Sequence, residues 1–282
     1  MQSYKIKSYA KINLSLRVLK KLKSKLHKIE TLITFLNLYD EIFIKKIKGK
    51  SHKVIFTGKF ADKIPKKNTI TKLLKILDDK KKLKNQKYLI KVNKQIPQKS
   101  GMGGGSMNSA SILKYLIKNK NIKLTTKEIF HIASKIGSDV AIGMQNKTSI
   151  LNESGIFKEI NKKLNLFTLL IRPNFGCSTK IIYKNVRNFS KPIFNKNKRY
   201  NLNHKFISNL RNDLEKPAFK KYPVLKLIKI FMEKFDDILF VRMTGSGSTI
   251  IGYFDSKKSA VNARKILAKK YKNYWCILSK TI

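Results

Sequence analysis

Cysteine and long apolar runs are both scarce in this chain of 282 residues. Its two cysteines, Cys177 and Cys276, fit a reducing compartment and favour unpaired thiols. No apolar stretch approaches the roughly 20 residues that span a bilayer, and the N-terminus lacks the apolar region of a signal peptide. We therefore expect a soluble, cytoplasmic protein without a membrane partner.

Acidic residues and arginine are scarce as well. The chain has 16 Asp+Glu against 63 Lys+Arg, which gives a formal net charge of +47, and only seven of the cations are arginine. Clustered cations would suggest a nucleic acid partner. Here the lysines are spread from Lys5 to Lys280, without the arginine forks that suit phosphates and base edges. We expect no specific nucleic acid partner, and abundant Lys, Asn and Ile with little Arg indicate A/T-rich codons.

The hydrophobic content is sufficient for a folded core. Hydrophobic residues make up 42% of the chain, whose length suits one large domain or two packed halves. Apolar residues alternate with polar ones over 10–18, which predicts a strand with one buried face. Further strands are expected at 54–56 and 88–92, with a helix at about 70–83 between them.

A glycine-rich segment follows the strand at 88–92. Four glycines occupy five positions from Gly101 to Gly105, and apolar residues then recur at helical spacing from Met107 to Ile117. Glycines before a helix N-terminus let backbone N–H groups approach an anion. The segment lacks the Lys-Ser/Thr of a P-loop, and no acidic residue follows at the distance typical of a dinucleotide-binding unit.

The rest of the chain predicts further helices and strands. Thr125 and Glu128 form a capping-box pattern that opens a helix ending at Gly137, with Asp139 just beyond it. After about residue 161 we expect strands at 166–171, 239–243, 249–254 and 274–278, and helices at about 203–212, 222–234 and 256–270. A turn, Thr244–Ser248, joins two of these strands.

Taken singly, the polar candidates are ambiguous. Asp139 suits a general base or a metal ligand, but a structural turn aspartate fits as well. Lys11 lies on the polar side of an apolar strand, where a solvated lysine is the commoner case. His27 fits either a buried hydrogen-bonding histidine or a ligand contact.

In combination, four segments resemble the GHMP superfamily of small-molecule kinases in order and spacing. They are residues 8–16, 97–110, 136–140 and 243–248, and the resemblance covers nearly the whole chain. His27 before Glu30, and the segment Asn212–Glu215, match best the branch that phosphorylates the 2-hydroxyl of a cytidine diphosphate-linked sugar alcohol in the non-mevalonate isoprenoid precursor pathway.

The resemblance implies roles for particular residues. Asp139 would take the proton from the attacking hydroxyl, and Lys11 would lie close to that hydroxyl and to the aspartate. Asn13 and His27 match positions near the cytidine, Tyr183 matches an aromatic residue that stacks on cytosine, and Thr179, Gly245 and Ser246 match further substrate contacts. The ATP phosphates would be wrapped by the glycine-rich segment, which comprises Pro97, Gln98, Lys99, Ser100, Gly101, Met102, Gly103, Gly104, Gly105, Ser106 and Met107.

The chain departs from the family pattern at several of these positions. Leu26 stands where the family has an aromatic residue before the histidine, which would leave one face of the cytosine less well stacked. Ser138 stands where alanine is common, and Met107 replaces a serine, which removes one hydroxyl from the phosphate loop.

The resemblance therefore predicts an α+β, two-domain GHMP kinase-like architecture with the active site in the cleft between the halves. The domains would be 1–160 and 161–282, and the protein a monomer or homodimer. ATP and Mg²⁺ would be required, with the metal ligands unknown. The alternatives are another GHMP kinase, acting on homoserine or mevalonate, and, from a different class, a basic nucleic-acid-binding protein.

Overall fold

The protein is described by a computed structural model that covers residues 3–24, 26–145, 147–194 and 200–282. They form two compact units, and each unit is assembled from several segments of the chain. The first unit comprises Met1–Ala10, Leu38–Gln98 and Gly103–Asn146, and the second comprises Lys11–Asn37, Lys99–Met102 and Lys147–Ile282.

These units differ from the consecutive halves, 1–160 and 161–282, that the sequence suggests. Two long strands, β1 (Ser3–Lys21) and β2 (His27–Ile47), each contribute to both units, and the glycine-rich segment is divided between Met102 and Gly103. Pairing of β1 with β2 therefore brings the N-terminal region into both units. The domain boundary at 160/161 stays a prediction.

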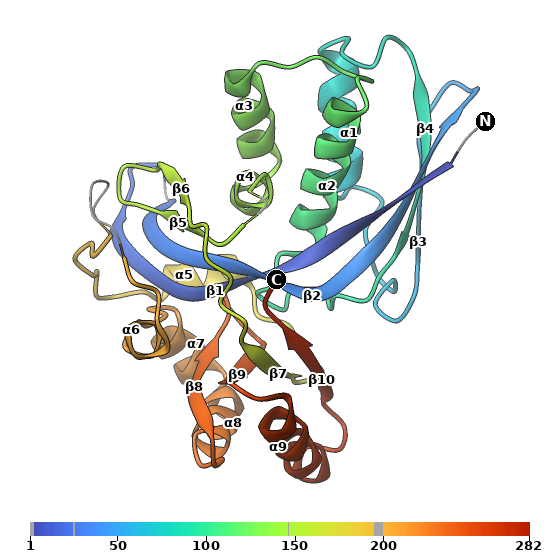
Figure 1. Cartoon of the computed structure of the whole chain (residues 1–282). Helices are drawn as coiled ribbons and strands as arrows, with labels where there is room; N and C mark the ends of the chain where they lie inside the picture. Colours follow the sequence, from blue (N-terminus) through green and yellow to red (C-terminus); the bar gives the residue numbers. More distant parts are fainter. Residues whose placement is uncertain (1–2, 25, 146, 195–199) are drawn as a thin grey trace. The chain divides into compact units, whose positions relative to one another are not determined.

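In the first unit, helices cover a group of paired strands. The helix α1 (Thr69–Asp79) connects the parallel strands β3 (Lys53–Thr57) and β4 (Lys87–Asn93), and β4 also pairs with the second part of β2. Three more helices follow, α2 (Gly104–Lys118), α3 (Thr126–Ile136) and α4 (Ser138–Gly143). The helices α1, α2 and α3 lie on one face of the strands, and their apolar side chains share a core with Ile44, Ile90 and Val92 (Figure 1).

Local sequence explains where two of these helices begin. Asn68 accepts hydrogen bonds from the backbone of Ile70 and Thr71 and so caps α1. Thr125 and Glu128 form the predicted capping box of α3. The helix predicted at 70–83 ends at Asp79, because Lys81 has a left-handed φ of 52° that no α-helix continues.

The second unit contains two groups of strands. The first part of β2 pairs with β5 (Ser149–Leu151), and β5 pairs with β6 (Phe157–Glu159). A separate antiparallel sheet has the order β10-β7-β9-β8. Its strands are β7 (Phe167–Arg172), β8 (Ile238–Met243), β9 (Ile250–Phe254) and β10 (Trp275–Lys280).

Five helices accompany the strands of the second unit in the part of the chain that the structure describes. The core of this unit joins apolar residues of β7, β8 and β9 to those of four helices, among them Leu225, Ile228 and Leu267. The five are α5 (Thr179–Lys184), α6 (His204–Ser208), α7 (Glu215–Lys221), α8 (Pro223–Met232) and α9 (Lys257–Lys270). The predicted strands after residue 161, and the helix at 256–270, thus correspond to observed elements.

The end of the chain is fixed inside the second unit. Ile282 N donates to Phe35 O at 3.1 Å, and Leu36 forms a β-bridge with Thr281. Thr281 also exchanges hydrogen bonds with Leu166, just before β7. The last two residues therefore connect β2 to the start of β7.

Candidate active site

The polar side of β1 is buried, so the predicted strand with a single buried face is wrong at this point. Lys11 and Asn13 are each 2% exposed. Lys11 Nζ donates to Asn13 Oδ1 at 3.0 Å, and Asn13 Nδ2 donates to Thr31 Oγ1 on β2 at 2.9 Å. Buried polar groups need such partners because losing water is costly. Among the lysines that the structure describes, only Lys11 and Lys94 are buried, which separates Lys11 from the solvated majority.

The first part of the glycine-rich segment lies beside Lys11. Lys11 N donates to Met102 O at 3.2 Å, and Asn13 N donates to Thr244 Oγ1 at 3.1 Å. Thr244 Oγ1 in turn donates to Gly101 O at 3.3 Å. Within the second unit, therefore, β1, Lys99–Met102 and the turn after β8 form one hydrogen-bonded group.

Gly101 has a structural reason to be glycine. Its φ is +80°, and a Cβ added there would lie 2.0 Å from Thr244 O. A side chain at this position would therefore strain the backbone of residue 101 and collide with the backbone of Thr244. At Gly101, the close backbone approach that glycine permits is made to the chain's own turn at Thr244.

The helix α5 connects two groups of predicted substrate residues. Thr179 Oγ1 and Ser246 Oγ lie 3.0 Å apart, so the start of α5 touches the turn that contains Gly245. Tyr183 is one helical turn further on, and its ring centroid lies 5.1 Å from that of His27. Burial, and secondarily Lys21, lowers the pKa of His27, so its imidazole is neutral near pH 7.

In the first unit, the remaining glycines open α2 as predicted. Gly103 has a left-handed φ of 66° and precedes the helix, which begins at Gly104. Among the described residues, no side chain caps this helix start. The first N–H groups of a helix lack partners inside the helix and carry partial positive charge. The backbone N–H groups of this first turn are therefore suited to binding an anion. Ser106 lies in the same turn and is half-buried.

A buried ion pair supports the strand that leads into the glycine-rich segment. Lys94 Nζ donates to Asp40 Oδ2, and Asp40 Oδ1 accepts from the backbone N–H of Gln95 and Ile96 at 2.7 and 2.9 Å. The Lys94 ammonium lies 3.2 Å from where a Cβ on Gly104 would be. Burial lowers the pKa of Lys94, and Asp40 opposes this shift. Asp40 thus holds both the cation and the backbone ahead of the loop.

Asp139 lies just beyond α3, as predicted, and in the first turn of the short helix α4. The end of α4 packs tightly on α2, because a Cβ on Gly143 would lie 2.7 Å from Ala110 Cβ and 2.8 Å from Met107 Cε. Asp139 is half-buried, and the fold places it on a helix that packs directly against the helix of the glycine loop.

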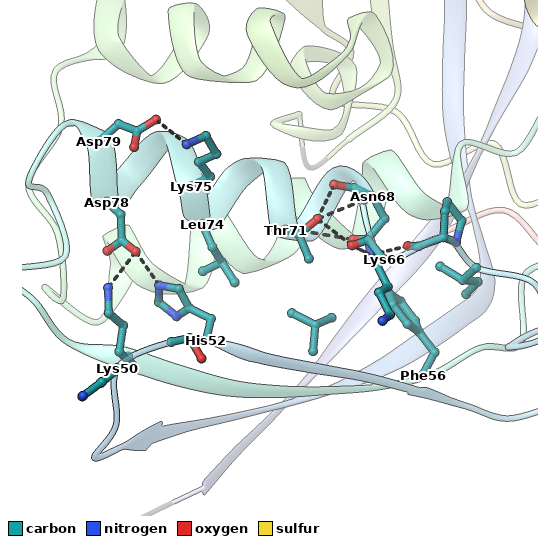
Figure 2. Close-up of a pocket in the computed structure, with 15 residues that line it drawn as sticks. Lys50, His52, Phe56, Lys66, Asn68, Thr71, Leu74, Lys75, Asp78 and Asp79 are labelled. Atoms are coloured by element: carbon teal, nitrogen blue, oxygen red, sulfur yellow. Dashed lines mark hydrogen bonds and ion pairs between the residues drawn. The ribbon is translucent and has the colours of Figure 1, made fainter.

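A cavity of about 520 Å³ lies elsewhere in the first unit, between α1 and β3. None of the predicted site residues lines it. Figure 2 shows Asn68 and Thr71 at the start of α1 and the pair formed by His52 and Asp78 near its end. His52 Nδ1 accepts from Tyr88 N at 3.0 Å, and Nε2 lies 3.1 Å from Asp78 Oδ2. Nε2 therefore carries the proton, and His52 is neutral.

The pKa of His52 should make the free energy of unfolding depend on pH. Burial lowers its pKa below the usual 6.5, against the opposing effect of Asp78. Below about pH 6.5 the unfolded chain therefore binds a proton that the folded protein does not. The free energy of unfolding is highest above about pH 6.5 and falls at lower pH, by at most about 1.4 kcal/mol per pH unit. We expect His52→Asn, which keeps an acceptor for Tyr88 N, to flatten this slope in urea unfolding between pH 7.5 and 5. The control, His131→Asn at an exposed position of α3, should retain the wild-type slope, and an unchanged slope in His52→Asn would contradict the assignment.

The sequence left the ligands of the expected Mg²⁺ unknown. Among the described residues, no three His, Cys, Asp or Glu side chains form a group that could hold a metal ion. Both cysteines are unpaired as predicted, and burial raises the pKa of each thiol to about 11. No described helix is both long and apolar enough to cross a bilayer.

The sequence motifs assign no individual role to Thr31, Thr244, Asp40 or Lys94, although two of these residues carry a signal. Asp40 shares its strand face with Leu38 and Ile42, and Lys94 continues the alternation of Ile90 and Val92. A charged residue in the apolar phase of a strand predicts a buried, paired group. The two threonines carry no such signal.

Comparison with known proteins identifies the class. The family model of the GHMP kinases N terminal domain matches residues 68–151, and that of the GHMP kinases C terminal matches residues 194–273. A solved 4-(cytidine 5'-diphospho)-2C-methyl-D-erythritol kinase has the same fold, with a TM-score of 0.75 and 21% identity over 98% of this chain and 99% of that chain. A homoserine kinase from Cytophaga hutchinsonii gives a TM-score of 0.64 and 16% identity, over 100% and 95%. The chain belongs to the GHMP kinase family, and the predicted α+β, two-domain GHMP kinase-like fold is confirmed.

The most similar relatives that we report belong to one branch of this family. The chain is 52% identical to the 4-diphosphocytidyl-2-C-methyl-D-erythritol kinase of Pelagibacter ubique, over the whole length of both proteins. It is 35% identical to the kinase of the same name from Petrotoga mobilis, over 87% of this chain and 96% of that protein. The branch of the family suggested by the sequence motifs is thereby confirmed.

Proposed function

We propose that this chain transfers the γ-phosphoryl group of ATP to the 2-hydroxyl of 4-diphosphocytidyl-2-C-methyl-D-erythritol, giving the 2-phosphate and ADP. The reaction belongs to the non-mevalonate route to isoprenoid precursors. The observation that carries the proposal is the 52% identity to the Pelagibacter ubique kinase across the full length of both chains. Identity at this level without gaps in coverage supports a shared substrate far better than a shared fold does.

Two residues would carry the chemistry. Asp139 would accept the proton of the attacking hydroxyl, and Lys11 would neutralise negative charge that develops on the transferring group. Phosphoryl transfer depends mainly on positioning and on charge neutralisation. Lys11 suits this role because its ammonium is buried and held by Asn13, so it needs little rearrangement during the reaction.

The glycine-rich segment, Pro97–Met107, would bind the ATP phosphates. Its support is the start of α2 at Gly104, where backbone N–H groups are available to an anion. Mg²⁺ would arrive with ATP, since this ion is usually held by phosphate oxygens, waters and one or two carboxylates rather than by a protein cage. The ion would shield the phosphate charge during transfer.

The cytidine part of the substrate would bind in the second unit. His27 would present one donor and one acceptor of its neutral imidazole to the cytosine edge, and Tyr183 would stack on the ring. Asn13, Thr179 and the Gly245–Ser246 turn would complete the contacts. The hydrogen bond between Thr179 and Ser246 supports their acting together.

A kinase assay tests the proposal. Purified protein with ATP and Mg²⁺ should turn over 4-diphosphocytidyl-2-C-methyl-D-erythritol, and homoserine and mevalonate should be poor substrates. Turnover of homoserine or mevalonate in place of the cytidine substrate would overturn the proposal. A protein with no kinase activity that binds one DNA sequence tightly at physiological salt would favour the nucleic-acid alternative.

The same proposal includes a cytoplasmic location, a monomer or homodimer, and the absence of a specific nucleic acid or membrane partner. Sedimentation of the purified protein would give its oligomeric state.

Replacing Lys11 tests its role separately. We expect Lys11→Met to lower kcat by about 10²–10³-fold, because the buried cation stabilises charge that is largest in the transition state. The KM for ATP should change only a few-fold. The matched control is Lys20→Met, which removes an exposed lysine from the same strand and should leave both constants unchanged. A larger effect on KM than on kcat would make Lys11 a ground-state binding residue instead.

A further inference from the structure

Three aromatic rings gather at the start of β2 in the second unit. The imidazole of His27 lies near two other rings. Its centroid is 5.1 Å from that of Tyr183 and 6.5 Å from that of Phe189. Each ring makes an angle of 36° with the imidazole. Phe189 is 47% exposed, and no motif of the sequence singled it out. The group therefore offers aromatic surface that the protein's own core leaves uncovered.

Phe189 is held in place by the segment that follows it. Ser190 N donates to Val18 O on β1 at 2.8 Å, and Ser190 Oγ donates to Asp213 Oδ2 at 2.5 Å. Arg17 Nε donates to Lys191 O at 3.0 Å. The chain beyond Phe189 is thus bonded to β1, the partner strand of β2.

A second anchor comes from β2 itself. The fully buried carboxylate of Glu30 accepts the backbone N–H groups of Ile193 and Phe194, each at 2.9 Å. Glu30 is three residues from His27 on the same strand. The segment that carries Phe189 is therefore fixed to the strand that carries His27, which is what positioning a ring beside the imidazole requires.

The residue just before His27 is not aromatic. Leu26 is 67% exposed and aliphatic, and its carbonyl oxygen accepts from Leu22 N at 2.8 Å in the turn between β1 and β2. It offers no π-face to a planar ligand. Aromatic rings, in contrast, stack favourably on flat heteroaromatic rings at centroid distances of about 4.5–7 Å.

We propose that Phe189 is a specificity-determining residue that provides the second stacking surface for the cytosine of the substrate, in place of a ring at position 26. The inference rests on the proposed function and deepens it. The cytosine would use the edge groups of His27 and the ring faces of Tyr183 and Phe189. Phe189 would contribute to substrate binding in the ground state and in the transition state alike.

Variants at position 189 test this directly. Phe189→Leu keeps apolar bulk and removes the ring, and we expect it to raise the KM for the cytidine substrate about tenfold, within the range of about 5- to 100-fold that loss of one base–aromatic stack gives. The KM for ATP and the kcat at saturation should stay within about twofold of wild type. Phe189→Trp should behave as wild type. Phe130→Leu, at an exposed aromatic position on α3, is the matched control and should change nothing.

Binding without reaction separates the inference from the proposed function. Calorimetric titration with CDP should show about tenfold weaker binding to Phe189→Leu than to wild type, and Phe189→Leu combined with Leu26→Tyr should recover part of this loss. If wild type does not bind CDP or turn over the cytidine substrate, the proposed function fails. If wild type does both but Phe189→Leu binds CDP equally well, or loses CDP and ATP binding alike, the role of Phe189 is refuted.

Discussion

Asp139→Asn is expected to lower kcat by about 10²–10⁴-fold, the range that general base catalysis contributes. The amide is nearly isosteric with the carboxylate but cannot take a proton, so the loss should be one of chemistry rather than of folding. Asp139 lies in the first turn of α4, and Gly143 at the other end of α4 fixes that helix against α2. Steady-state kinetics with both substrates measure the effect, and calorimetric titration with ATP should give a Kd within a few-fold of wild type.

The matched control for this variant is Asp79→Asn. Asp79 is an exposed aspartate at the end of α1, paired only loosely with Lys75 at 3.6 Å. Its replacement should leave kcat unchanged. Full activity in Asp139→Asn would remove Asp139 as the base, whereas loss of activity accompanied by loss of ATP binding would indicate a binding role.

The pair formed by Asp40 and Lys94 is expected to give the largest change in stability. Asp40→Asn should lower the free energy of unfolding by about 3–5 kcal/mol, because it leaves the Lys94 ammonium buried without a counter-charge. The double variant Asp40→Asn with Lys94→Met should be more stable than Asp40→Asn alone, since no buried charge remains uncompensated. Urea unfolding followed by circular dichroism measures both, and the cycle of four proteins gives the coupling energy.

An exposed ion pair provides the comparison. Lys75 and Asp79 on α1 have side-chain exposures of 77% and 61%, so the same cycle there should give a coupling below about 1 kcal/mol. Coupling of similar size at both pairs would contradict the account of Asp40 and Lys94. So would a double variant whose destabilisation equals the sum of the two single effects.

Strand and helix positions were predictable where one periodicity dominated. The capping box at Thr125 and the apolar repeat from Met107 to Ile117 gave α3 and α2 correctly. The 21-residue strand β2 was not predicted, because residues 30–36 are buried on both faces and so show no alternation. Periodicity identifies a strand only when its two faces differ in polarity, as they do over residues 10–18 of β1 but not over residues 30–36 of β2.

The candidate site shows the same limit at the level of single residues. The motif placed Lys11 and Asn13 on one strand, but its polar alternation suggested solvent, whereas the partner on β2, Thr31, makes that side a buried hydrogen-bonded row. The role of Gly101 depends on contact with Thr244, about 140 positions later in the chain. Such contacts are set by tertiary packing, which spacing within a motif does not encode.

The attachment of the last two residues to β2 affects how the protein can fold during its synthesis. Phe35 and Leu36 leave the ribosome early, but their partners, Ile282 and Thr281, are made only after residues 37–280. The second unit therefore cannot be completed until residues 281 and 282 have been made, while the apolar strands β1 and β2 already exist as nascent chain. Such a delay leaves hydrophobic strand edges uncovered and favours a requirement for chaperones in the interval.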